Sequence, residues 1–248
     1  MCIITCLISF ATPKLQKTRV NRVVFSFFLY LCNGNQIFMQ EIRETNSYRL
    51  ALKDKILKKA MELFIQHGIR AVKMDDIAQG LSISKRTLYE IYTDKEELLF
   101  EGIKTYNCQR VDHLTEFASQ KGIHVIDIIL EAYKLKVDEV RQVNPTFYED
   151  ILKYPKVEEF IRTAHENSRE EFLNFMQRGV NEGLFRKDIN HVLIAQQMDA
   201  MSKYINQYNL WQKYSFSELF ANFYLVSLRG LCTERGVKVL DKAMAKIQ

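Results

Sequence analysis

The sequence predicts an all-α protein. Its 248 residues include only three Pro and nine Gly, so few residues interrupt helices. Apolar residues recur at helical spacing along most of the chain, and no stretch alternates apolar and polar residues as a strand would. A hydrophobic content of 47% and a charged content of 26% are typical of a folded, soluble protein.

The first 38 residues differ from the rest. They contain basic residues but no acidic ones, three of the five Cys, and a ten-residue apolar run from Val23 to Cys32. This run is short of the roughly 20 residues that a membrane span needs. It resembles an export signal, although no small-residue cleavage site follows. We expect residues 1–38 to be a translated leader with Met39 as the true start; a disordered extension and an export signal are the alternatives.

The charge is unevenly distributed. The whole chain carries +5, of which residues 1–38 supply +4. Residues 49–95 contain ten basic and six acidic side chains, a net +4, which leaves about −3 for the remainder after Met39. A basic module on a mildly acidic body is expected of a DNA-binding protein with a separate sensing domain.

The stretch from Met74 to Tyr92, MDDIAQGLSISKRTLYEIY, has the pattern of two short helices that cross at a tight turn. Ala78 is small enough for the second helix to approach, and Ser84 is a good N-cap for that helix. Five apolar residues would hold the pair together: Ile77, Leu81, Ile83, Leu88 and Ile91. Helical spacing then directs four residues outward: Lys85, Arg86, Tyr89 and Glu90. Cations on a capped helix suit a nucleic-acid groove, so we interpret the stretch as a helix-turn-helix rather than a hairpin with a merely solvated surface.

Helices are also predicted on both sides of this motif. Residues 52–66 form one that ends at Gly68, and Asp94 with Glu97 forms a capping box for a long one reaching towards Gly122. The later helical patterns cover residues 125–141, 147–154, 157–180, 190–208 and 217–232, and a short helix follows Gly236.

The stretch ALKDKILKKAMELFIQHGIRAVKMDDIAQGLSISKRTLYEIYTDKEELL resembles the N-terminal DNA-binding domain of the TetR family of transcriptional regulators. The matching positions include Ala60, Leu63, Phe64, Gly68, Ile77, Ala78, Ser84, Lys85, Thr87, Leu88, Tyr89, Lys95, Glu96 and Leu98. Three positions depart from the family: Ser82 stands where Gly is usual in the turn, Glu90 where His is frequent, and Ile91 where an aromatic residue is common. An acid at Glu90 repels phosphate but can accept from a cytosine amino group.

The resemblance implies a three-helix helix-turn-helix domain at residues 39–94 and a larger helical regulatory and dimerisation domain at residues 95–248. The expected DNA-binding residues are Lys73, Ser84, Lys85, Arg86, Thr87, Tyr89, Glu90 and Lys95. Arg86 and Lys85 would meet base edges or phosphates, Thr87 and Tyr89 the backbone, and Lys95 a flanking phosphate. The family binds small effectors among its middle helices, and the candidate wall residues here are Tyr133, Phe147, Phe160, His165, Phe172 and Met198.

The partners implied are a double-stranded DNA operator, an apolar or aromatic effector and a second copy of the chain, without a membrane. In the family the two late long helices pair with those of a second subunit. Here that pairing would use an apolar face made of Met198, Met201, Ile205, Phe220, Phe223 and Leu228; packing inside one subunit is the alternative. The lone thiols after Met39, Cys108 and Cys232, favour a reduced, cytoplasmic protein. The sequence has no catalytic motif and no His or Cys spacing for a metal, so we expect no enzyme activity, cofactor or metal. The alternatives are an activator or ligandless regulator, and a helical small-molecule carrier or membrane-attached protein that does not read DNA.

Overall fold

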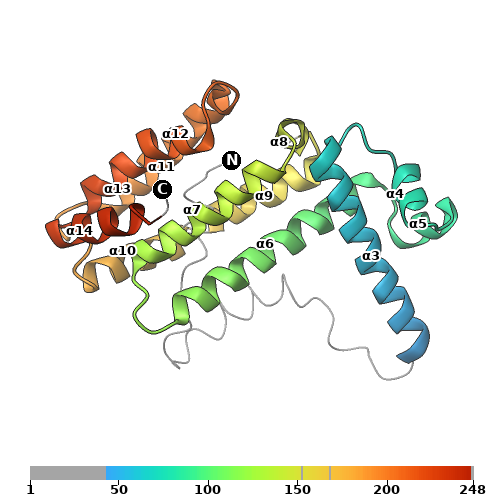
Figure 1. Cartoon of the computed structure of the whole chain (residues 1–248), viewed down its shortest axis with the longest axis horizontal. Coiled ribbons are helices and arrows are strands. Elements are labelled where there is room, and N and C mark those ends of the chain that lie inside the picture. Colours follow the sequence, from blue (N-terminus) through green and yellow to red (C-terminus); the bar gives the residue numbers. More distant parts are fainter. Residues whose placement is uncertain (1–42, 152, 168, 247–248) are drawn as a thin grey trace. The chain divides into compact units, whose positions relative to one another are not determined.

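The structure, a computed structural model, describes residues 43–151, 153–167 and 169–246, with side chains left out at 43–47 and 164–169. Helices make up its regular structure, which confirms the all-α prediction, and the described residues contain no strand beyond an isolated bridge between Phe185 and Cys232 (Figure 1). None of the described helices combines the length and the apolar character needed to cross a membrane. The expectation for residues 1–38 lies outside the described residues.

The chain forms two compact units. The head unit contains the described residues up to 109 together with 143–158, and the body unit contains residues 110–142 and the described residues from 159 onward. The helices of the head unit are α3 (Arg43–His67), α4 (Met74–Gly80), α5 (Lys85–Ile91), the first part of α6 (Lys95–Ser119), α8 (Pro145–Ile151) and the start of α9 (Pro155–Asn167).

Helix α3 is the centre of the head unit, where it packs against α4 and α8, and α4 packs against α5. Its inner face is fully buried at Ile56, Ala60 and Phe64. The helix begins at Arg43, earlier than predicted, because residues 43–51 contain no Pro or Gly to stop it. Gly68 ends it as predicted, at φ 83°, and its amide donates to the Phe64 carbonyl at 2.9 Å.

The predicted cap of α6 is present in a modified form. The Asp94 carboxylate accepts the backbone N–H of Glu97 at 2.8 Å. The Glu97 carboxylate reaches back to the amide of Thr93 at 2.7 Å and to its hydroxyl at 2.6 Å, one residue earlier than a simple capping box. These bonds lower the pKa of Glu97. Its carboxylate therefore stays ionised while it satisfies the amide at the start of the helix.

The body unit consists of amphipathic helices around one apolar core. Its helices are the rest of α6 and of α9, with α7 (Val125–Gln142), α10 (Arg169–Asn181), α11 (His191–Gln207), the 3-10 turn η1 (Leu210–Gln212), α12 (Phe216–Leu219), the π-helical segment η2 (Phe220–Leu225), α13 (Val226–Leu231) and α14 (Glu234–Met244). Tyr133 stacks on Phe220 with ring centroids 4.1 Å apart, and the hydroxyls of Ser202 and Tyr224 are 2.9 Å apart. Buried hydroxyls are thus paired within the core.

Some predicted elements of the body unit need correction. The last large helix begins at Phe216, capped by Ser215, and is built from α12, η2 and α13. The helix expected after Gly236 begins at Glu234 because the Thr233 hydroxyl caps it. The prediction of one helix over residues 157–180 corresponds to α9 and α10, on either side of residue 168, which lies outside the described residues.

The predicted pairing face is also partly wrong. Four of its residues are at most 3% exposed and belong to the core of the body unit: Met198, Ile205, Phe220 and Leu228. They lie on the inner faces of α11, η2 and α13, so they pack inside one subunit, which was the alternative interpretation. Met201 and Phe223 are only partly buried.

Candidate nucleic-acid interface

Helices α4 and α5 form the predicted helix-turn-helix. Ile77, Ala78 and Leu88 are buried at its crossing, and the Ala78 carbonyl accepts the amides of Leu81 at 3.3 Å and Ile83 at 3.0 Å in the turn. Small size at residue 78 lets the turn fold back onto the helix that precedes it. The remaining predicted contacts, Leu81, Ile83 and Ile91, are partly buried.

Two serines set the geometry of the turn. Ser82 has φ 54°, in the left-handed region that Gly usually occupies. The serine that replaces the usual Gly of the turn therefore adopts a backbone conformation that is sterically unfavourable for a residue with a Cβ. Ser84 is the N-cap of α5, and its hydroxyl accepts the Thr87 amide at 3.0 Å, as predicted. The Ser84 and Thr87 hydroxyls are 2.8 Å apart. A capped start fixes the direction of the recognition helix α5.

Lys85, the first residue of α5, is paired with an acid of α4. Its Nζ lies 2.8 Å from a carboxylate oxygen of Asp75, and both side chains are more than half exposed. The hydrogen bond to Asp75 raises the pKa of Lys85, so the side chain stays charged. The same ammonium lies 6.0 Å from the ring centre of Tyr89, one turn further along α5. Lys85 and Tyr89 therefore occupy one patch of the outer face.

Arg86 and Glu90 form a second pair on the outer face of α5. The Arg86 Nε donates to Glu90 Oε1 at 2.9 Å, and the two side chains are 89% and 58% exposed. Exposed i, i+4 pairs contribute little stability, because water solvates each partner well. Both recognition-helix cations can therefore exchange an acidic partner for a DNA acceptor at small cost.

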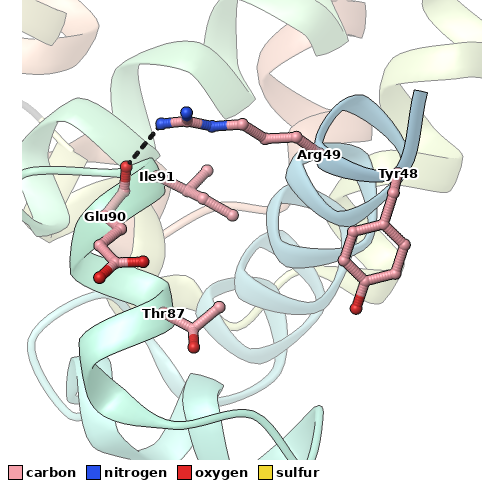
Figure 2. Close-up of a pocket in the computed structure, with 5 residues that line it drawn as sticks. All are labelled: Tyr48, Arg49, Thr87, Glu90 and Ile91. Atoms are coloured by element: carbon pink, nitrogen blue, oxygen red, sulfur yellow. Dashed lines mark hydrogen bonds between the residues drawn. The ribbon is translucent and has the colours of Figure 1, made fainter. Parts of the chain in front are cut away.

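Arg49, which the sequence did not single out, holds the end of α5. Its terminal nitrogen donates to the backbone carbonyl of Glu90 at 3.1 Å, as Figure 2 shows. This carbonyl lies in the last turn of α5, where helical carbonyls lack partners and favour a cation. Arg49, Tyr48, Thr87, Glu90 and Ile91 line a shallow groove between α3 and α5. Arg49 and Glu90 are 41 positions apart in the sequence, so no local pattern could have identified their contact.

Lys95 and Lys73 lie beside the motif rather than on α5. The Lys95 ammonium donates to the carbonyls of Ile69 at 3.0 Å and Val72 at 2.9 Å. Burial lowers its pKa. The side chain thus has a structural role that was not predicted, with one of its three donors left for a phosphate. Lys73 is the N-cap residue of α4, and its amide donates to the Asp76 carboxylate at 2.7 Å.

The candidate effector residues do not form one group in the structure. Tyr133, Phe172 and Met198 belong to the core of the body unit, whereas Phe147 is buried in α8 of the head unit. Phe160 is partly buried on α9, and His165 lies on the same helix with its side chain outside the described ones. Their role in ligand binding stays a prediction.

Comparison with known proteins agrees with the geometry of the head unit. Residues 56–101 match the model of a family described as bacterial regulatory proteins, tetR family. This stretch holds the second half of α3, the helix-turn-helix and the start of α6. The chain is a TetR-family transcriptional regulator.

Curated relatives of this TetR-family regulator extend into the body unit. It is 23% identical over 158 residues to the HTH-type transcriptional repressor KstR2 of Mycolicibacterium smegmatis, covering 61% of this chain and 76% of the relative. It is also 23% identical over 159 residues to IcaR of Staphylococcus epidermidis, the negative regulator of the biofilm operon icaADBC, covering 54% of this chain and 83% of that protein.

Solved structures agree with the fold of the TetR-family regulator. A transcriptional regulator from Saccharomonospora viridis, solved in complex with choline, superposes with a TM-score of 0.59 at 16% identity, over 75% of this chain and 100% of that one. A TetR-family regulator from Agrobacterium tumefaciens gives a TM-score of 0.54, also at 16% identity, over 75% and 100% of the two chains. At such identities the likeness concerns the fold alone.

Proposed function

We propose that this protein is a transcriptional repressor that binds a palindromic DNA operator as a homodimer and releases it when a small effector binds. The observation that supports this most directly is the capped, cation-bearing outer face of α5 within the family's DNA-binding motif. The two relatives named as a repressor and a negative regulator favour repression over activation. A DNA target would place the protein in the cytoplasm.

The residue roles follow from exposure and geometry. Arg86 is the most exposed side chain of the two ion pairs and lies near the start of α5, where recognition helices contact base edges. Lys85 and Tyr89 share a patch suited to the phosphate backbone, and Ser84 with Thr87 fixes the first turn. Lys73 and the remaining donor of Lys95 would contact flanking phosphates.

A second copy of the chain would pair through an apolar face on α11 and α13 that the core leaves uncovered. Leu193 and Tyr204 lie on α11, Tyr208 directly follows its last residue, and all three are 49–59% exposed. Val226 of α13 is 62% exposed. The ring of Tyr204 lies 6.4 Å from that of Phe223 on η2, the segment that continues directly into α13. Isolated exposed apolar residues are common, but several of them on neighbouring segments are typical of an interface.

Dimerisation meets a physical need of DNA reading. One short recognition helix contacts few bases, so two heads spaced by about one DNA turn, roughly 34 Å, give the specificity that a repressor requires. We assign the DNA-binding function to residues 39–94 and effector binding with dimerisation to residues 95–248. The effector would be apolar or aromatic and would favour the conformation that does not bind DNA.

Fluorescence-anisotropy titration of the full chain with DNA from upstream of its own gene tests the proposal, with scrambled DNA of equal length as the control and two salt concentrations. Tight binding to the native fragment alone, with two subunits per site, is the expected result. Weak and equal binding to both DNAs that disappears with added salt would contradict the proposal, because only the non-specific electrostatic attraction would remain.

The dimer is tested by sedimentation of Val226→Glu and Tyr204→Glu, each of which places a charge in the apolar face. Both should convert the dimer to a monomer and weaken operator binding. Tyr214→Glu is the matched control, since Tyr214 is 50% exposed and lies outside α11 and α13. A dimer that persists in both face variants would show that the subunits pair elsewhere.

A further inference from the structure

The Arg86–Glu90 pair presents a row of donors next to an acceptor on the outer face of α5. Arg86 uses its Nε for Glu90 Oε1, and the described residues offer no acceptor to its two terminal nitrogens. Glu90 Oε2 has no hydrogen-bond partner among the described residues, and the Glu90 side chain is 58% exposed. A guanidinium offers donors in a planar fork, and a carboxylate offers acceptors only.

Base-pair edges in the major groove differ in the order of their donors and acceptors. Guanine presents two adjacent acceptors, N7 and O6, and its cytosine partner presents the N4 amino donor beside them. An A·T pair instead places the adenine amino donor between two acceptors. A fork of donors followed by a carboxylate therefore matches a G·C pair and mismatches the other edges.

The position of Glu90 also favours a base contact over a backbone contact. A carboxylate placed against phosphate would be repelled, so a helix lying in the groove must direct Glu90 towards an amino group. Arg49 holds the backbone of Glu90 from α3, at 3.1 Å from its carbonyl, which fixes where the side chain emerges. Lys85 contacts Asp75 and Tyr89, so its side chain does not occupy the position of the Arg86–Glu90 pair.

We propose that Arg86 and Glu90 together read a single G·C base pair in each operator half-site. Arg86 donates to guanine O6 and N7, and Glu90 accepts the N4 amino group of the paired cytosine. The inference rests on the proposed function, since it requires α5 to lie in the major groove. Glu90 thus contacts the cytosine directly and does not merely orient Arg86.

Selection of bound sequences from a random double-stranded DNA library by the full chain provides the test. Competition binding with all four base pairs at each half-site position then measures discrimination. Glu90→Gln keeps the shape of the side chain and removes its charge, and Arg86→Lys keeps the charge and removes the planar fork. Glu62→Gln is the matched control, because Glu62 is a similarly exposed acid of α3 paired with Lys59.

The expected result is that Glu90→Gln and Arg86→Lys both lower the preference for G·C at the same position, each by roughly tenfold, while Glu62→Gln changes nothing. Changes at different positions, or an unaltered base preference in Glu90→Gln, would overturn the inference. Failure of the wild-type chain to enrich any sequence would instead overturn the proposed function itself.

Discussion

The Nζ of Lys85 lies 2.8 Å from a carboxylate oxygen of Asp75, so the first cation of the recognition helix is partnered by an acid of the preceding helix. DNA binding must replace this partner with a phosphate or a base. The acid therefore opposes binding in two ways, because it occupies the ammonium and adds a negative charge near the DNA.

Asp75→Asn should strengthen binding to all DNA sequences by roughly two- to fivefold at low salt, with a smaller gain at high salt. The reason is that Lys85 loses its competing carboxylate and the head unit loses one negative charge. Anisotropy titrations at several salt concentrations measure this effect. Asp54→Asn, which removes a similarly exposed acid paired with Lys58 on α3, is the control and should have less effect. Equal gains in both variants would mean that only the net charge matters.

Lys95 connects the start of α6 to the segment that follows α3. Lys95→Met removes both hydrogen bonds and leaves the carbonyls of Ile69 and Val72 without a partner. Because the side chain is partly exposed, we expect a loss of about 1–2 kcal/mol in the free energy of unfolding, measured by urea denaturation. Lys95→Arg should retain part of this stability. If Lys95→Met were as stable as the wild type and lost only DNA affinity, the Lys95 ammonium would contact phosphate and would not stabilise the fold.

The helix-turn-helix was predictable because its determinants are local. Ser84 caps the helix that it precedes, and Ala78 and Leu88 show their burial through helical spacing. The contact of Arg49 with Glu90 and that of Lys95 with Ile69 join residues 41 and 26 positions apart. Their geometry depends on tertiary packing, which no local pattern contains.

The pairing face shows a second limit of sequence patterns. Helix α11 carries apolar residues on two sides, with Met198 in the core and Tyr204 in solvent. Periodicity identifies apolar positions but does not tell which side faces the core of the same subunit. The choice of Met198 and Ile205 for a pairing surface was therefore wrong, although their own helix, predicted at residues 190–208, is present as α11.

Ser82 stores backbone strain at the turn of the motif. At φ 54° a residue with a Cβ pays a steric cost that Gly avoids. Ser82→Gly should therefore raise the free energy of unfolding by about 0.5–1 kcal/mol, after the greater flexibility of Gly in the unfolded chain is allowed for. Thermal denaturation measures this change in stability. Ser82→Ala is the control, because Ala keeps the Cβ and should not gain stability from relief of the strain. A lower stability in Ser82→Gly would show that the serine hydroxyl outweighs the strain.

Asp150 should make the head unit sensitive to acid. Its carboxylate accepts the amide of Arg70 at 3.0 Å and the ammonium of Lys153 at 2.9 Å, and its side chain is 8% exposed. Burial alone would raise the pKa of Asp150, but the bonds from Lys153 and Arg70 outweigh it and lower the pKa below its usual value. A carboxyl whose pKa is lower in the folded state stabilises the fold above its unfolded pKa of about 3.9, and this stabilisation is lost as the pH falls through the folded value.

The matched variant for this effect is Asp150→Asn, which keeps the shape but cannot ionise. At pH 7 it should be less stable than the wild type by about 1–2 kcal/mol, since one charged hydrogen-bonding group is lost. The difference should shrink towards zero as the pH falls below about 4, because the wild-type carboxyl then becomes neutral as well. Urea denaturation at pH 7, 5, 4 and 3 measures both curves. A difference that stayed constant over this range would mean that the Asp150 charge does not stabilise the fold.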